Sequence, residues 1–489
     1  MKSNNKFKLL HTHFDWILIA ICILAYTVVF SYFSILRHNA FASGYDLANM
    51  DQTIWNSLQG RFFSFSQYGA TMTRFTTHAD VILVLLAPLY LIWDNVRMLL
   101  IFQSFVLALG AIPTYLIGKL ILRSKPLAFL VVVIYLLNPG MQWTNIYDFH
   151  AVSMAIPLLL LVFYFGYTGK WRWYLIAALF AALTKEQVPL TIGSIGIALA
   201  LLKRGKAVFI GPVTLLIGIV YSLSVILVVI PYFEVDGMYK YAPWYDGVIQ
   251  RIKESKLIDV PGELIRNYVM SPDALAYYRL LLRPFGLLPL FGLPIFLIIA
   301  GPELSIILLS YHAQMRSIML HYDSVLVPGL VISSIYGIHW TQLLIYRLIA
   351  HEKTRSVLFG LFLFSASALI LRFSYFHTPT PVSPTCWCRM YDVSEADKAF
   401  AKLLETIPQH ASVTASPEIR PHITHRRLAY TMPDATSSAD FIAIIDQNRL
   451  PGDYNPKGFE LELMAVLDTS EQHELVKRIG HFSLYQRTR

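Results

Sequence analysis

The chain has 489 residues, of which 55% are hydrophobic and only 15% are charged. Soluble proteins carry about 25% Asp, Glu, Lys and Arg, so this composition, with a mean hydropathy of +0.51, predicts a polytopic membrane protein. It excludes coiled-coil, disordered and nucleic-acid-binding chains, and the net charge of +9 is therefore interpreted by its distribution across the membrane.

The first apolar run covers residues 16–35 and follows a short basic stretch. Ala40, Phe41 and Ala42 resemble a cleavage site, so a signal peptide is the alternative interpretation. Because the run is longer than a typical signal core, we expect an uncleaved membrane span. Further apolar runs occupy residues 79–93, 96–120, 126–139, 151–168, 172–184, 187–203, 207–231, 284–301, 302–318, 324–346 and 354–375.

The run at 79–93 decides the topology. It is short, contains Pro88 and has the length of an interfacial or re-entrant helix. If it does not cross, all the basic loops between later runs lie on the side of the N-terminus, which the positive-inside rule makes cytoplasmic. We therefore predict about 11 spans in a cell membrane (inner or plasma), with the N-terminus cytoplasmic and the C-terminus external.

The composition changes near residue 375. We predict a membrane domain at 1–375 with a first external loop at 37–95, a proline-containing linker at 376–389, and an external soluble domain at 390–489. Patterns in this last part predict helices at about 394–405 and 457–467 and strands at 411–415 and 441–445. The expected fold class is thus mainly α: a membrane helical bundle followed by a small α/β domain.

Three cysteines exclude a disulfide scaffold. Cys22 lies in the first apolar run, whereas Cys386 and Cys388 could form only a small strained ring or stay reduced. A redox or metal role for this pair is the alternative, although one Cys-x-Cys motif without further ligands supports it weakly.

Ionisable residues at membrane depth need a partner or a purpose, because each costs about 2.5–3.5 kcal/mol on insertion scales. In the first external loop, Asp46 precedes a helix-compatible stretch at 47–58, so it could simply be a helix N-cap. Asp51 lies five positions further on, about 140° around a helix. The two carboxylates are therefore not an obvious acid–base pair.

Four more candidates are ligand types: His78, Asp148, His150 and His321. Carboxylate plus imidazole suits a divalent metal. However, Asp148 and His150 are two positions apart and converge only in a loop or strand, and a hydrogen-bonded interfacial cluster is the commoner fate of such residues. The sequence leaves both interpretations open and names no cofactor.

Lys185 and Glu186 lie between two apolar runs. Either the two charges neutralise each other, or Lys185 binds a phosphate while Glu186 orients the Lys185 side chain. Arg316, near His321 and Tyr322, invites the same interpretation because a guanidinium binds phosphate oxygens through two parallel hydrogen bonds.

These stretches resemble a widespread bacterial and archaeal family of predicted membrane proteins of unknown function. The shared motifs are Tyr/Phe-Asp-Leu followed by Asp-Gln-x-x-Trp-Asn, here Tyr45 to Asn56, then His78 with Leu-x-Ala-Pro-Leu-Tyr at 85–90, Asp-Phe-His at 148–150, Thr-Lys-Glu at 184–186, and Arg-Ser-Ile with His-Tyr at 316–322. The resemblance continues through residues 407–422 and covers nearly the whole chain.

That family in turn resembles the GT-C class of membrane glycosyltransferases, which take sugars from polyprenyl-phosphate carriers at the outer leaflet. In that class an acidic residue in the first external loop is the catalytic base, so the resemblance implies that Asp46 is the base of an inverting transfer. The second acidic residue that often stands beside it is absent, because Leu47 follows Asp46.

The resemblance also implies that the other candidates surround the substrate, with Lys185 and Arg316 on the phosphate. These substrate-binding candidates are Asp51, His78, Asp148, His150, Lys185, Glu186, Arg316, His321 and Tyr322. The expected partners are a polyprenyl-phosphate-linked sugar, the lipid bilayer and an acceptor that the sequence does not name. A non-enzymatic transporter or lipid flippase is the alternative. Transporters favour binding sites near the bilayer midplane and inverted repeats, whereas the ionisable candidates here cluster at one interface and the sequence shows no convincing internal repeat.

Overall fold

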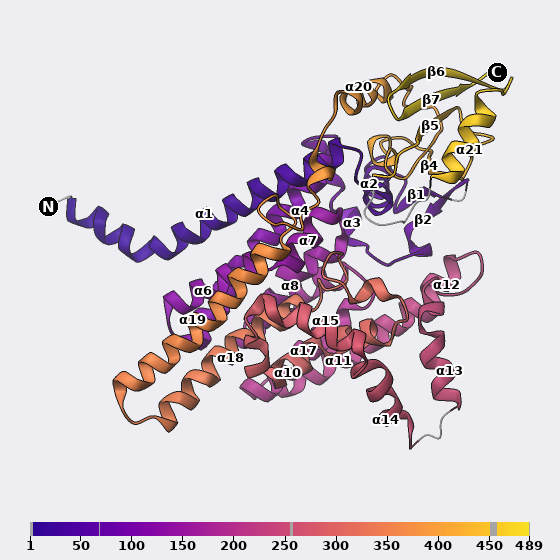
Figure 1. The fold of residues 1–489 in the computed structure, drawn as a ribbon. Helices are drawn as coiled ribbons and strands as arrows, with labels where there is room; N and C mark the ends of the chain where they lie inside the picture. Colours follow the sequence, from indigo (N-terminus) through magenta and orange to yellow (C-terminus); the bar gives the residue numbers. More distant parts are fainter. Residues whose placement is uncertain (1–2, 68, 255–257, 450–456, 489) are drawn as a thin grey trace. The chain divides into compact units, whose positions relative to one another are not determined.

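The computed structural model describes residues 3–67, 69–254, 258–449 and 457–488. The chain divides into two compact units, each described by itself. The helical unit comprises Met1–Val29, Ser104–Thr144 and Val152–Cys386, and the α/β unit comprises Phe30–Gln103, Asn145–Ala151 and Trp387–Arg489. Each unit therefore brings together segments far apart in the sequence (Figure 1).

Four stretches of helix in the described residues are long and apolar enough to cross a membrane. They are Phe14–Asn39 in α1 (Ser3–Asn39), Arg97–Leu122 in α4 (Arg97–Leu109) and α5 (Ala111–Leu122), Ala207–Phe233, which starts with α11 (Ala207–Ser224), and α19 (Glu352–His377). The helices α6 (Lys125–Leu136) and α7 (Pro139–Tyr147) form another candidate span, bent by 42°. Pro139 lies at the break, where it removes a backbone donor.

Shorter or more polar helices fill most of the other predicted runs. They are α8 (Ala155–Tyr167), α9 (Trp171–Ala182), α10 (Val188–Lys203), α17 (Leu293–Leu309) and α18 (Val327–Leu348). The predicted helical bundle is thereby confirmed, whereas the number of spans stays a prediction. Short elements between them are η3 (Ala151–Met154), η4 (Val225–Val229), α12 (Ile230–Phe233), η5 (Ala242–Tyr245), α13 (Asp246–Glu254), α14 (Val260–Leu264), η6 (Ile265–Val269) and η8 (Ala313–Arg316).

One predicted boundary between apolar runs is wrong. The runs at 284–301 and 302–318 are not two helices, because Pro302 lies inside the single helix α17. The chain instead reverses earlier, after α15 (Pro272–Leu282) and η7 (Arg283–Phe285). Gly286 and Leu287 make the turn with φ angles of 60° and 61°, and α16 (Leu288–Phe291) and α17 then lead away from it. We call residues 272–309 the reversing hairpin.

The turn of the reversing hairpin packs against the interior of two long helices. A Cβ at Gly286 would lie 2.6 Å from the carbonyl oxygen of Ala366 in α19, and one at Gly337 in α18 would lie 2.2 Å from that of Leu288. Small residues allow such close backbone approach between helices in a membrane. The hairpin therefore turns inside the helix bundle rather than at its end.

In the α/β unit, the first loop folds into α2 (Tyr45–Leu58), an antiparallel pair β1 (Ser64–Gln67) and β2 (Ala70–Thr73), and η1 (Arg74–Thr76). The run at 79–93 forms only α3 (Ile82–Leu85) and η2 (Ala87–Leu91). A helix over Ile82–Leu91 extends about 15 Å, half the hydrocarbon thickness of a bilayer. This length agrees with an interfacial segment.

The C-terminal part forms a five-stranded sheet in the order β4-β3-β5-β7-β6. β3 runs parallel to β4 and β5, and β7 runs antiparallel to β5 and β6. The strands are β3 (Val413–Ala415), β4 (Ala429–Thr431), β5 (Phe441–Ile445), β6 (His473–Ile479) and β7 (Phe482–Arg487), with η9 (Cys388–Tyr391), α20 (Glu395–Leu404), η10 (Arg420–His422) and α21 (Gly458–Leu467) beside them. The predicted small α/β region is confirmed, although β4, β6 and β7 were not predicted.

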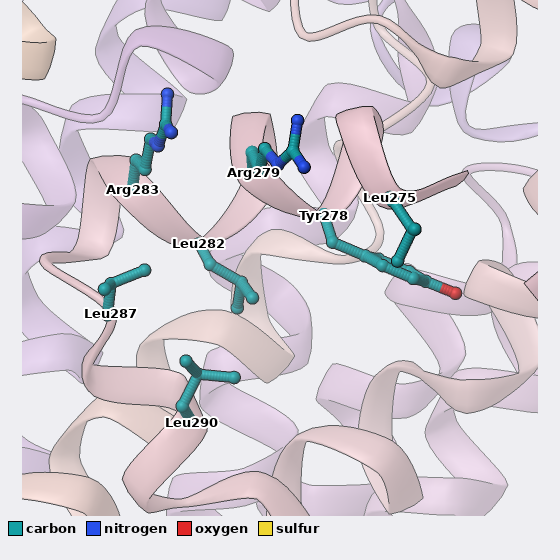
Figure 2. Close-up of a pocket in the computed structure, with 7 residues that line it drawn as sticks. All are labelled: Leu275, Tyr278, Arg279, Leu282, Arg283, Leu287 and Leu290. Atoms are coloured by element: carbon teal, nitrogen blue, oxygen red, sulfur yellow. The ribbon is translucent and has the colours of Figure 1, made fainter. Parts of the chain in front are cut away.

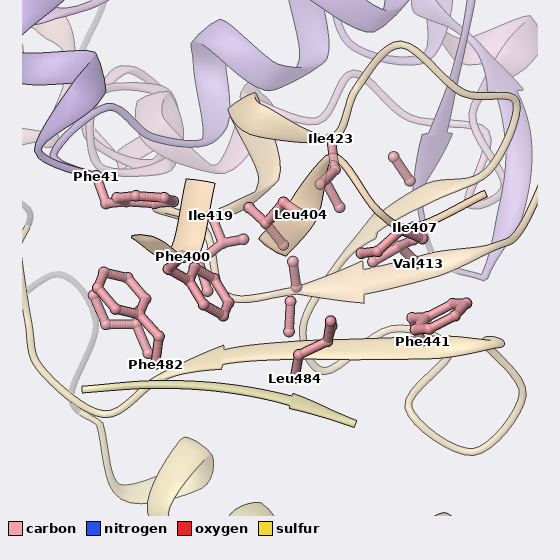
Figure 3. Packing of buried hydrophobic residues seen from close by; sticks show 14 of the residues in the cluster. Phe41, Phe400, Leu404, Ile407, Val413, Ile419, Ile423, Phe441, Phe482 and Leu484 are labelled. Atoms are coloured by element: carbon pink, nitrogen blue, oxygen red, sulfur yellow. The ribbon is translucent and has the colours of Figure 1, made fainter. Parts of the chain in front are cut away.

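Aromatic rings fill the core of this sheet on the side of α20 (Figure 3). Phe482 lies 4.5 Å from Phe400 and 4.8 Å from Phe41, measured between ring centroids. Phe41 precedes α2 and is fully buried in this cluster, and a buried side chain of this size contributes about 2 kcal/mol. The first loop is thus part of the core of the C-terminal sheet.

Candidate functional site

Asp46 lies in the first turn of α2. The helix begins at Tyr45, and its N-cap is Gly44, which has no side chain to accept a hydrogen bond. The N-cap interpretation of Asp46 is therefore wrong, because the helix starts one residue before it. Its Oδ2 instead lies 3.2 Å from Nε2 of His150, and the Asp46 side chain is 39% exposed.

His150 is held from several sides. Its backbone amide donates to Oε1 of Gln103 over 2.8 Å, and Nε2 of Gln103 donates to the carbonyl oxygens of Asn145 and Asp148 over 3.1 and 2.9 Å. The ring of Tyr147 stacks on the imidazole at 5.6 Å. The Gln103 bonds hold the backbone of this segment, while the Tyr147 ring and the carbonyl oxygen of Asp148, 3.3 Å from Nδ1 of His150, orient the imidazole toward the Asp46 carboxylate.

Asp148 forms a buried ion pair. It accepts from Nη1 of Arg37 over 2.9 Å and from the backbone amide of Gly44 over 3.1 Å. The Arg37 and Asp148 side chains are only 1% and 3% exposed. Gly44 lies two residues before Asp46, and His150 lies two residues after Asp148. Asp148 therefore positions the two segments that carry Asp46 and His150.

The two carboxylates have different electrostatic surroundings. Burial opposes ionisation of Asp46, but the hydrogen bond with His150 and the charges of His150, Arg74 and His78 lower its pKa below the usual value. Burial raises the pKa of Asp148 above the usual value, although Arg37 acts against it. Asp46 is therefore ionised at neutral pH and able to accept a proton.

His78 lies near this cluster, because its charge acts on Asp46. Arg74 donates to both oxygens of Asp80 in a buried pair, with Nη2 of Arg74 2.9 Å from Oδ2 of Asp80. Four predicted candidates, Asp46, His78, Asp148 and His150, thus lie together in the α/β unit. Asp46 and His150 offer the carboxylate oxygen and imidazole nitrogen that a divalent metal prefers.

Asp51 faces a different environment, as the spacing predicts. Its fully buried carboxylate accepts hydrogen bonds from the hydroxyls of Tyr90 and Thr424 and lies 3.2 Å from Nε2 of His425. Nδ1 of His425 lies 2.7 Å from the carboxylate of Asp94. Asp51 therefore joins α2 to the C-terminal sheet region.

Arg420 joins the same two parts. Its fully buried guanidinium donates to Oδ1 of Asn49 over 2.6 Å and to Oε1 of Gln52 over 3.1 Å, both on α2. It also donates to the carbonyl oxygen of Ser66, to that of Ala429 and to the hydroxyl of Thr431. The helix that carries Asp46 is thus held by a cation of the C-terminal region.

The other candidates lie in the helical unit. Glu186 is buried, with its carboxylate 3.4 Å from the hydroxyl of Tyr239. Lys185 acts electrostatically on Glu303, a buried residue of α17 whose carboxylate accepts from Gln187 over 3.5 Å. Lys185 and Glu186 therefore belong to a wider polar cluster than the predicted pair.

Arg316 lies near His312, on which its charge acts. Its Nη1 donates to the carbonyl oxygen of Ser310 over 2.6 Å. The rings of His321 and Tyr322 lie 4.4 Å apart, and His312 stacks on Trp244 at 4.2 Å. The candidates Lys185, Glu186, Arg316, His321 and Tyr322 thus all lie in the helical unit, and their meeting with Asp46 in one cavity stays a prediction.

Sequence reasoning missed several of these residues. Arg37 and Glu303 are ionisable residues at the end of an apolar run and inside one, and this position alone marks them as candidates. Gln103 and Arg420 give no such signal, because an amide in an apolar run and an arginine in a soluble segment are both ordinary.

The cysteines have simple roles. Cys386 and Cys388 are disulfide-bonded, and Cys22 is a free thiol. The pair has thus formed the small ring that the spacing allows, and we assign it no metal role.

Two solved structures of ArnT from Cupriavidus metallidurans have the same fold as this chain. The form bound to undecaprenyl phosphate has a TM-score of 0.53 at 13% identity, covering 95% of this chain and 97% of that chain. The apo form has a TM-score of 0.51 with the same identity and coverage. The archaeal oligosaccharyltransferase AglB from Archaeoglobus fulgidus has a TM-score of 0.41 at 12% identity, covering 96% of this chain and 74% of that chain.

At these identities the likeness concerns the fold, which is the GT-C fold of ArnT. No curated protein matches the chain in sequence. Residues 37–466 match the model of the family described as "Predicted membrane protein (DUF2079)", a range that includes every candidate residue. The chain therefore belongs to the DUF2079 family of predicted membrane proteins.

Proposed function

We propose that the protein is an inverting GT-C-type glycosyltransferase that moves a sugar from a polyprenyl-phosphate carrier to an acceptor at the outer face of the cell membrane. The observation that carries this proposal is the Asp46 carboxylate, ionised, partly exposed and held by His150 in the loop after the first apolar helix. The fold of ArnT, which was solved with undecaprenyl phosphate bound, supports the choice of carrier.

The proposed reaction balances as a displacement at the anomeric carbon. Asp46 takes the proton of the acceptor hydroxyl while the hydroxyl oxygen bonds to that carbon. The bond from the carbon to the phosphate oxygen breaks, and its electron pair leaves on the polyprenyl phosphate. Attack opposite the leaving group inverts the configuration.

The leaving phosphate gains negative charge, and fixed cations stabilise it most in a site of low dielectric constant. We assign this role to Lys185 and Arg316. We place His78, Glu186, His321 and Tyr322 around the sugar or a divalent metal. The contacts of Asp51 favour a structural role at the C-terminal sheet region over sugar binding.

The proposed orientation places the N-terminus in the cytoplasm and the first loop and C-terminal domain outside. It is supported by the basic residues of the short loops between the apolar helices. We retain residues 376–389 as the linker and 390–489 as the external domain, which packs on the first loop through Phe41.

The test is Asp46→Asn in the full-length protein, reconstituted in nanodiscs with a panel of undecaprenyl-phosphate-linked sugars and a membrane extract as acceptor. Loss of the base should lower the transfer rate by about 10²–10⁴-fold. Asp392→Asn is the matched control, because it removes an exposed carboxylate of the same unit. It should transfer at the wild-type rate, and both variants should melt at the wild-type temperature.

Near-normal transfer by Asp46→Asn would exclude Asp46 as the base. Movement of the carrier-linked sugar across sealed proteoliposomes without a covalent product would instead establish the transporter alternative.

A further inference from the structure

A second site lies on the reversing hairpin. It is a groove of about 270 Å³ lined by Leu275, Tyr278, Arg279, Leu282, Arg283, Leu287 and Leu290. Figure 2 shows the side chains of Arg279 and Arg283 pointing the same way, away from Leu282 and Leu290. One end of the groove is therefore cationic and the other is apolar.

The two arginines are available to a ligand. They are four positions apart, so they share one helix face. Both are exposed, and in the described part of the chain neither side chain forms a hydrogen bond or ion pair with protein. Arg316 and Arg420, in contrast, use their guanidinium groups on protein acceptors. Two adjacent unpaired guanidinium groups have a strong preference for an anion.

The groove lies along the apolar part of the helical unit. Arg283 is three residues from Gly286, which packs on Ala366, eleven residues before the end of α19 at His377. Eleven helical residues correspond to about 16 Å, so Arg283 is attached well inside the length of an apolar helix. Leu287 and Leu290 are 36% and 45% exposed there, which suits contact with lipid chains. A cation bordering lipid requires an anionic partner.

We propose that this groove binds the discharged carrier, a polyprenyl phosphate monoester, and this proposal rests on the proposed function because sugar transfer releases that product. Charge complementarity selects the occupant. Two guanidinium groups match a phosphate monoester, which carries about −1.5 to −2 charge at pH 7, better than a phosphodiester with a single charge. The row of leucines contacts the first isoprene units, which are apolar.

The experiment measures binding and needs no sugar donor. Full-length protein in phosphatidylcholine nanodiscs is titrated with undecaprenyl monophosphate, and bound lipid is counted by native mass spectrometry. Arg279→Gln/Arg283→Gln should weaken binding of the lipid in the groove at least about tenfold, because it removes charge-assisted hydrogen bonds, while a second lipid stays bound at Lys185 and Arg316. Arg266→Gln, which removes another exposed arginine outside the groove, should bind as the wild type does. Phosphatidylglycerol at the same concentration should not displace the monophosphate.

Unchanged binding by the double glutamine variant overturns the proposal, and so does equal binding of phosphatidylglycerol, which would make the groove a general anionic-lipid site. Arg279→Lys/Arg283→Lys keeps the charge and should bind between wild type and the glutamine variant, which checks that the loss is not misfolding. If the wild type transfers no sugar but the tenfold loss is found, only the transferase proposal fails. If transfer occurs and the loss is absent, only the groove proposal fails.

Discussion

Replacing Arg420 by Met should loosen α2, the helix that carries Asp46. The guanidinium is fully buried and donates five hydrogen bonds, three of them to α2 and β1. Hydrogen bonds to charged groups contribute about 1.5–3 kcal/mol each, but some freed acceptors will find new partners. We therefore expect a net loss of about 4 kcal/mol in the free energy of local opening, at the upper end for one substitution. This corresponds to about a thousandfold larger open population of α2.

Hydrogen exchange of the full-length protein, followed by mass spectrometry, measures this opening. Peptides covering Tyr45–Leu58 and Ala429–Thr431 should exchange about a thousandfold faster in Arg420→Met, and the proposed sugar transfer should fall because Asp46 is no longer positioned. Arg427→Met is the matched control, since Arg427 lies on the same segment with an exposed side chain. If α2 exchanges within about twofold of wild type in Arg420→Met, the C-terminal region does not hold this helix.

Three further perturbations test other contacts. Burial alone would lower the pKa of His425, but two neighbouring carboxylates raise it above the usual value. The protonated form therefore stabilises the fold fully below about pH 6.5, and this stability is lost as pH rises through the folded pKa. The wild-type melting temperature should therefore fall more steeply from pH 6 to 9 than that of His425→Gln, and parallel slopes would refute this. Arg37→Met should cost about 3–5 kcal/mol by leaving Asp148 buried without its partner, and adding Asp148→Asn should recover most of it in the same melting assay. Gly337→Ala should destabilise the protein by about 1–3 kcal/mol, because its Cβ would meet the backbone of Leu288. The control Gly360→Ala should not, because its Cβ meets nothing within 4 Å. Equal melting temperatures of the two variants would contradict the packing of the hairpin turn.

The bundle was predictable because length and apolarity of a run are local properties of the sequence. The reversing hairpin was not predictable. The predicted boundary between residues 301 and 302 falls inside α17, while the real turn uses Leu287 with a positive φ. Its position depends on contacts of Gly286 and Gly337 with other helices. Such contacts depend on tertiary packing, which one sequence does not display.

The candidate site was predictable in part, because an ionisable residue beside an apolar run is also a local property of the sequence. Asp46 and His150 were found because ionisable residues beside apolar runs are unusual, and the structure brings them within 3.2 Å. The residues that hold them, Arg37 and Gln103, act through partners 42 to 111 positions away. Pairing over such distances leaves no spacing pattern in a single chain.

The hydrogen bond of Arg420 to Asn49 also sets an order of events during synthesis, since the two residues are 371 positions apart in the sequence. At a synthesis rate of about 5–20 residues per second, α2 is translated roughly 20–75 s before Arg420. For that interval the segment around Asp46 lacks the buried partners it will later have. The newborn protein therefore needs its residues as far as Arg420 before the proposed base is in place, and a ribosome that stops before Arg420 yields a chain whose first loop lacks these contacts.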